Sequence, residues 1–222
     1  MLPHLLRRNR LFFGLYALAL IGVGVVQLLY SQEQLMQWVN VRNSLAADSF
    51  FTYATYLGDG AFFVAVCLLL TYTNRRVGGL AFASFALSSL TSLLLKLVAF
   101  PDSLRPLKKF EHSTFEYHII KDLNIYSYNS FPSGHTTSAF ALFSLLAFLD
   151  WRKGRGWLWF GLAALTGYSR VYLFQHFVED AYVGSIVGTT ASVLVYVAMR
   201  RWVFQTKRPD LEETGPAVET NE

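Results

Sequence analysis

Three cationic side chains in this 222-residue sequence stand beside short polar motifs, a pattern typical of anion binding. They are Lys96, Arg105 and Arg170. Arginine presents a rigid fork of donors to the oxygens of a tetrahedral anion, and lysine adds a compact point charge. We therefore expect these three side chains to bind a phosphate group.

The segment Pro132-Ser133-Gly134-His135 has the composition of a helix start that could cradle the same anion. Proline at the first helical position leaves the backbone N–H groups that follow it unpaired, and helix N-termini attract anions. Gly134 has no side chain to obstruct the anion, and the hydroxyl group of Ser133 is one more donor. We expect both residues to bind phosphate.

Two histidines could carry out chemistry on a bound phosphoryl group. His176 and Asp180 are four residues apart, so on a helix they would be neighbours on one face. The carboxylate can accept from one imidazole nitrogen and leave the other as a nucleophile. His135 belongs to a different helix and can protonate the leaving group, then activate water. The pattern predicts a double displacement through phosphohistidine without a metal or cofactor, because the cations neutralise the charge.

The order of these motifs resembles the type 2 phosphatidic acid phosphatases. The signatures of that family are Lys-x6-Arg-Pro, Pro-Ser-Gly-His and Ser-Arg-x5-His-x3-Asp. The second is met in full by residues 132–135, and the third by Ser169-Arg170 with His176 and Asp180. Over roughly residues 50–200, the resemblance implies the same roles: phosphate binding by Lys96, Arg105, Ser133, Gly134 and Arg170, an acid at His135, and a nucleophile at His176 supported by Asp180.

The first signature differs from the family pattern, because eight residues rather than six separate Lys96 from Arg105. Two explanations are open. An insertion around Pro101-Asp102 could loop out and keep Lys96 in the site, or Lys108 or Lys109 could supply the missing charge.

The elements that must position these residues are apolar and of membrane-spanning length. Hydrophobic residues make up 53% of the chain and charged residues only 15%, whereas soluble domains carry about 25% charged residues. Six segments are close to the length of about 20 residues that a spanning helix needs. They are 11–30, 49–72, 78–100, 135–150, 156–173 and 181–200.

The sequence therefore predicts an all-α fold, a six-transmembrane helical bundle with a long polar loop between the third and fourth spans. The spans form one membrane-embedded domain, 1–206, and the polar residues 207–222 are expected to be a disordered tail. The fourth span, 135–150, is the shortest and begins with polar residues, which a helix buried among the others would tolerate.

The basic residues predict the orientation, because Lys and Arg concentrate in cytoplasmic loops. Most of the 19 Lys and Arg residues lie in the N-terminus, at 75–76, at 152–155 and at 200–208. We expect both termini to be cytoplasmic and the site to face the periplasm from a bacterial inner membrane. The basic residues form short clusters rather than one continuous patch, so no nucleic-acid partner is expected.

Other polar residues have simpler interpretations or two open ones. Asp59 lies within the second expected span, so it either serves the site or caps a helix break between Gly58 and Gly60. We interpret His112 and His118 as ordinary loop residues. Cys67 is the only cysteine, which excludes an internal disulfide and a cysteine metal site.

These observations predict a lipid phosphatase whose partners are a phosphorylated membrane lipid and the bilayer. The candidate substrates are undecaprenyl pyrophosphate, which we favour, phosphatidylglycerol phosphate, phosphatidic acid and the lipid A phosphates. The first alternative is a lipid phosphotransferase using the same intermediate, and the second is a non-enzymatic membrane transporter. A vanadate-dependent haloperoxidase is disfavoured because those relatives are soluble.

Overall fold

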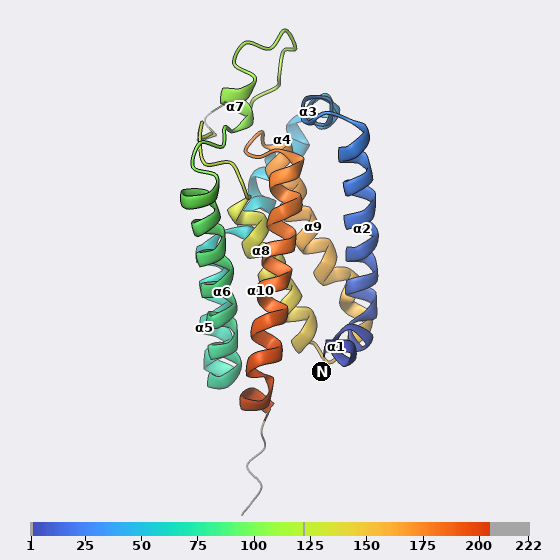
Figure 1. Ribbon diagram of the computed structural model, residues 1–222, viewed down its shortest axis with the longest axis vertical. Coiled ribbons are helices and arrows are strands. Elements are labelled where there is room, and N and C mark those ends of the chain that lie inside the picture. Colours follow the sequence, from blue (N-terminus) through green and yellow to red (C-terminus); the bar gives the residue numbers. More distant parts are fainter. Residues whose placement is uncertain (1, 122, 205–222) are drawn as a thin grey trace, which may run out of the picture.

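Long apolar helices lie side by side along the long axis of the computed structural model, which describes residues 2–121 and 123–204 (Figure 1). The α-helices are α1 (Leu2–Arg8), α2 (Arg10–Leu29), α3 (Gln32–Asn40), α4 (Leu45–Ala54), α5 (Gly60–Thr73), α6 (Arg75–Leu94), α7 (Pro106–Lys109), α8 (Gly134–Leu149), α9 (Gly156–Tyr172) and α10 (Val178–Phe204). Short 3₁₀ turns, η1 (Thr55–Gly58) and η3 (Lys153–Arg155), and a π-turn, η2 (Leu95–Ala99), join them. The predicted all-α fold is confirmed.

Only some of these helices are long enough to span a membrane. The helices α2, α6 continued through η2, and α10 are each long and apolar enough to cross a bilayer. A fourth candidate combines α4 and η1 with α5, which are bent by 52° relative to one another. The helix α8 is apolar but has 16 residues, and α9 has 17. The protein is therefore an integral membrane protein, whereas six spans remain a prediction.

The second expected span, 49–72, is not one straight helix. It breaks at Asp59, whose side chain caps α5 by accepting a hydrogen bond from the Ala61 backbone N–H at 2.7 Å. Gly58, just before the break, packs so closely against α8 that a Cβ would lie 2.5 Å from the His135 carbonyl oxygen. The interpretation of Asp59 as the cap of a helix break is confirmed.

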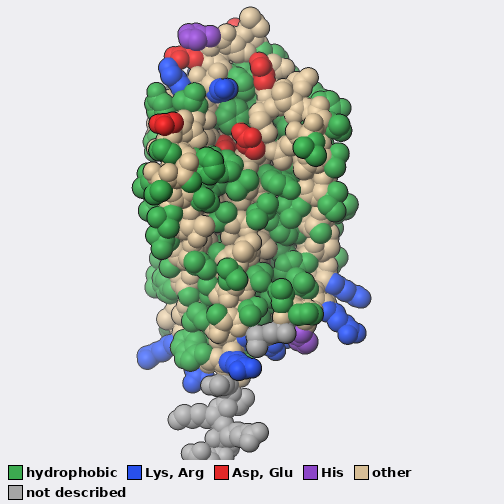
Figure 2. Space-filling view, in the orientation of Figure 1, with side chains coloured by type: hydrophobic (Ala, Val, Ile, Leu, Met, Phe, Trp, Pro, Cys, Tyr) green, Lys and Arg blue, Asp and Glu red, His purple; other side chains and the backbone are tan. Residues whose placement is uncertain are grey.

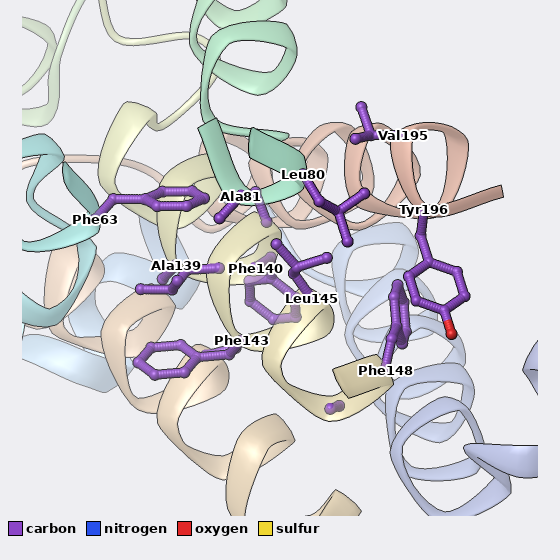
Figure 3. Packing of buried hydrophobic residues seen from close by; sticks show 14 of the residues in the cluster. Phe63, Leu80, Ala81, Ala139, Phe140, Phe143, Leu145, Phe148, Val195 and Tyr196 are labelled. Carbon is purple, nitrogen blue, oxygen red and sulfur yellow. The ribbon is translucent and has the colours of Figure 1, made fainter. Parts of the chain in front are cut away.

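The helix α8 lies at the centre of the bundle, packed against α6, α9 and α10. Leu142 and Leu145 are completely buried, and the phenylalanines of α8 contribute to a core that also includes Phe63 and Tyr196 (Figure 3). Burial on all sides explains how this short helix accommodates hydroxyl side chains. The prediction that the segment 135–150 is buried among other helices is confirmed.

The two ends of the bundle differ in what they carry. The long loop, residues 101–131, lies with α3 at one end, which we call the loop end, whereas α1 and the last turn of α10 lie at the opposite end (Figure 1). Lys and Arg side chains surround the opposite end in Figure 2, below a broad hydrophobic surface. The orientation stays a prediction, because it rests on this same distribution of basic residues. The expected tail, 207–222, lies outside the described residues.

Topology can be tested with reporters at the two ends. Because Lys and Arg favour the cytoplasmic side, we expect a reporter fused after Arg201 to be active in the cytoplasm. One inserted near Glu116, in the long loop, should be active only on the opposite side. Alkaline phosphatase and fluorescent-protein fusions measure the two locations, and the reverse pattern would mean that the loop end faces the cytoplasm.

Candidate active site

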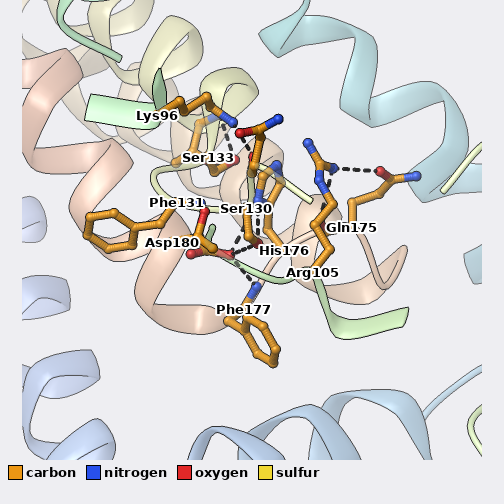
Figure 4. Close-up of polar contacts among 12 residues, drawn as sticks. Lys96, Arg105, Ser130, Phe131, Ser133, Gln175, His176, Phe177 and Asp180 are labelled. Carbon is orange, nitrogen blue, oxygen red and sulfur yellow. Dashed lines mark hydrogen bonds and ion pairs between the residues drawn. The ribbon is translucent and has the colours of Figure 1, made fainter. Parts of the chain in front are cut away.

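The site residues meet at the loop end, where four parts of the chain converge (Figure 4). They are the π-turn η2, the two ends of the long loop, the N-terminus of α8, and the segment from the end of α9 to the start of α10. The structure brings together the three groups expected to act on phosphate: the cations, the helix start and the two histidines.

His176 and Asp180 form a buried pair. The His176 Nδ1 atom lies 3.3 Å from the Asp180 Oδ2 atom, and both side chains are 2% exposed. The sequence predicted that His176 lies on the same helix as Asp180. It lies instead in the turn before α10, where its backbone N–H donates to the Arg170 carbonyl at 3.2 Å. Because the carboxylate accepts from Nδ1, the Nε2 atom keeps a lone pair.

The surroundings of His176 favour the neutral imidazole. Burial lowers the pKa of His176 well below its ordinary value, and the positive charges of Arg105 and Arg170 lower it further. A neutral ring is nucleophilic, whereas a protonated one is not. The same cations that would bind an anionic phosphoryl group therefore also keep the nitrogen unprotonated.

Arg105 is fixed by a set of acceptors from two parts of the chain. Its Nε donates to the Tyr128 carbonyl at 3.0 Å, and its Nη1 donates to the carbonyl and side-chain oxygens of Gln175 at 3.2 and 3.1 Å. Gln175 is 4% exposed and in turn donates to the Asn124 carbonyl at 2.9 Å. Burial lowers the pKa of Arg105, but arginine retains its charge at neutral pH.

Arg170 retains an unused donor. Its Nη1 donates to the Thr55 hydroxyl at 2.6 Å, which connects the end of α9 to η1. The Arg170 side chain is buried, with the residue only 7% exposed, so its Nε has little access to water. Within the described part of the chain, this Nε has no hydrogen-bond partner. A buried donor without a partner is costly, so an anion that accepts from it would be stabilised.

The structure favours Lys96 over Lys108 as the third cation of the site. The π-turn η2 carries Lys96 toward the long loop, where its Nζ donates to the Asn129 carbonyl at 2.8 Å. Pro101 and Asp102, where the insertion hypothesis places the additional residues, form a turn beyond η2. Lys108 is instead paired with Glu111 at an exposed position, with 2.5 Å between Nζ and Oε2.

The helix α8 starts two residues later than expected. Its first residue is Gly134 rather than Pro132, and its N-cap is Ser133, whose buried hydroxyl accepts from the Thr136 hydroxyl at 2.9 Å. The Ser133 backbone N–H is not free, because it donates to the Asp180 carbonyl at 3.0 Å. A Cβ on Gly134 would meet no atom within 4 Å, so open space lies beside the first helical residue. The donors left for an anion are the N–H groups of Gly134 and His135.

His135 lies opposite a carboxylate at the break in the second span. Its Nε2 is 3.9 Å from Asp59 Oδ2, and the two side chains are 33% and 40% exposed. They are thus far more accessible than His176. Asp59 therefore caps α5 and also lies next to a candidate site residue, while a role in the site stays a prediction.

His118 lies in the long loop, as interpreted from the sequence, but the fold gives it partners. Its Nε2 lies 2.9 Å from Asp48 Oδ2, and its backbone pairs with the Asn40 side chain. Asp48 also accepts from the Tyr172 hydroxyl at 2.6 Å. These bonds connect the long loop to α3, α4 and α9.

Three polar residues of the site have no place in the recognised motifs: Ser130, Gln175 and Thr55. Ser130 is completely buried and donates to Asp180 at 2.5 Å, while Gln175 and Thr55 hold the two arginines. Ser130 and Gln175 adjoin the second and third motifs, which is the only signal in the sequence that could have identified them. Thr55 is distant from every motif and required the fold.

Comparison with solved structures identifies the same architecture in two bacterial membrane proteins. LpxE of Aquifex aeolicus has a TM-score of 0.61 and 24% identity, covering 74% of this chain and 93% of that one. A transmembrane PAP2 type phosphatidylglycerolphosphate phosphatase of Bacillus subtilis has a TM-score of 0.59 and 21% identity, covering 90% of this chain and 99% of that one. At these identities the likeness concerns the fold.

Sequence comparisons supply the family. The bacitracin transport permease protein BcrC of Bacillus licheniformis is 38% identical over 68 residues, a match that spans 31% of this chain and about a third of that protein's length (32%). The family model of the PAP2 superfamily matches residues 78–204, which include every residue expected to bind phosphate or act on it. Because this match covers more than half of the 222 residues, the chain belongs to the PAP2 superfamily.

Proposed function

We propose that the protein is a lipid phosphatase, which hydrolyses a phosphomonoester or diphosphate of a membrane lipid through a phosphohistidine at His176. The observation that carries the proposal is a buried, neutral imidazole held by Asp180 and surrounded by cations. The unpaired Nε of Arg170 and the open space at Gly134 support a tetrahedral anion as the ligand. An anion there would satisfy both.

In the first step the Nε2 atom of His176 attacks phosphorus. The nitrogen–phosphorus bond forms as the bond from phosphorus to the lipid oxygen breaks, and His135 transfers a proton to the departing oxygen. Asp180 stabilises the positive charge that develops on the imidazole. Lys96, Arg105 and Arg170 neutralise the charge on the phosphoryl oxygens.

In the second step water replaces the histidine. His135, now neutral, accepts a proton from water as the oxygen attacks phosphorus, and the bond to Nε2 breaks to release inorganic phosphate. The Asp59 carboxylate lies 3.9 Å from His135 Nε2, close enough to stabilise the positive charge that forms on the ring as it accepts this proton. The partial exposure of both side chains gives water a route to the site.

Among possible substrates, we favour undecaprenyl pyrophosphate, followed by phosphatidylglycerol phosphate, phosphatidic acid and the lipid A phosphates. A long-chain lipid suits a site at the edge of apolar helices, and the charge distribution supports a loop end on the side opposite the cytoplasm. The phosphotransferase alternative uses the same geometry. The word permease in the name of one relative keeps a transporter as the other alternative.

Phosphate release from purified protein in detergent tests the function. We expect release from at least one of the four lipids without an added acceptor, because water completes the cycle. Activity should persist in excess EDTA and be inhibited by vanadate, since protein cations hold the phosphoryl group. Strict dependence on an acceptor would identify a transferase, and EDTA inactivation reversed by magnesium would contradict the mechanism.

Lysine substitutions test which charge completes the phosphate site. Lys96→Met should lower kcat/KM by about 10- to 100-fold, because hydrogen bonds to charged groups contribute roughly 1.5–3 kcal/mol. Lys108→Met is the matched control, since that lysine is paired with Glu111 at an exposed position. The assignment of Lys96 is wrong if the control loses as much activity as the Lys96 variant.

The two histidines should respond differently to substitution. His176→Ala should form no phosphoenzyme, even with an activated aryl phosphate. His135→Ala should lose about 10²–10⁴-fold with a lipid substrate but be partly rescued by the aryl phosphate, which needs little protonation. Asp180→Asn should fall between them. Acid-labile label from a radiolabelled donor measures the intermediate, and equal labelling of the two alanine variants would refute the assigned roles.

A further inference from the structure

The side chain of Ser130 is buried beneath the candidate nucleophile. Its exposed fraction is 0%, and its hydroxyl donates to Asp180 Oδ2 at 2.5 Å. The same hydroxyl oxygen lies 3.5 Å from His176 Nδ1. Ser130 thus contacts both members of the pair on the Nδ1 side of the ring, away from the nitrogen that would attack phosphorus.

The carboxylate of Asp180 has its orientation fixed by donors on one oxygen. Besides the serine hydroxyl, Oδ2 accepts from the Phe177 backbone N–H at 2.8 Å and faces His176 Nδ1 at 3.3 Å. A short bond from a hydroxyl group to a carboxylate is among the stronger neutral-to-charged hydrogen bonds. Without it, a buried carboxylate would lose one of its few donors and part of the restraint on its rotation.

Ser130 is itself held by the opposite end of the long loop. Its backbone N–H donates to the Ser103 carbonyl at 3.1 Å, and the next N–H, of Phe131, donates to the Ser103 hydroxyl at 3.1 Å. Two residues beyond Ser103, Arg105 donates from its backbone to the Ser127 carbonyl at 2.9 Å. The loop segment that carries a phosphate-binding cation therefore also positions the serine beneath the nucleophile.

We propose that Ser130 is a positioning residue for phosphohistidine formation, acting through the Asp180 carboxylate to keep Nδ1 of His176 as the donor and Nε2 directed at phosphorus. The proposal rests on the proposed function, because it assigns Ser130 a part in that reaction. Ser130 does not touch the phosphoryl group in this arrangement. Its loss should therefore lower the rate of the chemical step and leave substrate binding unchanged.

The test compares Ser130→Ala with Ser144→Ala. Ser144 is also 0% exposed, and its hydroxyl donates to Thr189 at 3.4 Å within the bundle, so the control deletes a buried, bonded hydroxyl distant from the motifs. We expect Ser130→Ala to lower kcat by about 10- to 100-fold with little change in KM, the loss typical of a hydrogen bond to a charged group. Ser144→Ala should keep kcat. Each kcat is calculated from the concentration of active sites, measured as the maximum amount of phosphoenzyme formed. A variant that is partly unfolded is then not mistaken for one with a slow chemical step.

A double-mutant cycle with Asp180→Ala decides whether the serine acts through the carboxylate. Once the carboxylate is absent, Ser130→Ala should cause no further loss of kcat. Full additivity of the two losses, an unchanged kcat in Ser130→Ala, or an effect confined to KM would each overturn the proposal while leaving the phosphatase function intact. A wild-type protein that forms no phosphohistidine and releases no phosphate would overturn both.

Discussion

The close approach of α8 to α10 is the constraint on which the rest of the structure depends. On α10, a Cβ at Gly188 would lie 2.2 Å from the Thr137 carbonyl oxygen, and one at Gly184 would lie 2.8 Å from the Ser133 carbonyl oxygen. Small residues allow such contact between helices in a membrane. At the loop end the same approach lets the Ser133 N–H donate to the Asp180 carbonyl. The start of the helix that would bind phosphate is thereby fixed against the start of the helix that orients the nucleophile.

The long loop has a structural reason for its length. A loop of about 30 residues is uncommon in a compact domain and is usually functional. Here its first part carries Arg105 and its last part carries Ser130, and an isolated bridge between Leu104 and Tyr128 joins the two. Near the middle of the loop, the His118 side chain pairs with Asp48 on α4. Both ends of the loop therefore contribute residues to the site, and its middle is bonded to α3 and α4 through His118.

The break in the second candidate span serves the accessible side of the site. Here η1 packs against α8 through Gly58, the chain turns, and Asp59 caps α5 with one oxygen while the other lies 3.9 Å from His135. The same turn places Thr55 where it accepts from Arg170. A residue that would be costly inside a straight span is thus located where polar groups gather.

The sequence by itself determined the family, the all-α membrane fold and the identity of the motif residues, because hydrophobic run length and fixed spacings are local properties of a chain. The tertiary structure decided what depends on distant segments. It favoured Lys96 over Lys108 through the π-turn, because spacing along the chain does not measure distance in space. It moved His176 from the helix to the turn before it, where the Arg170 carbonyl holds its backbone. It also showed the hydrogen-bond and ion-pair partners of Ser130, Gln175 and His118. The sequence could not identify these partners, because they lie on segments that only the fold brings close to the loop.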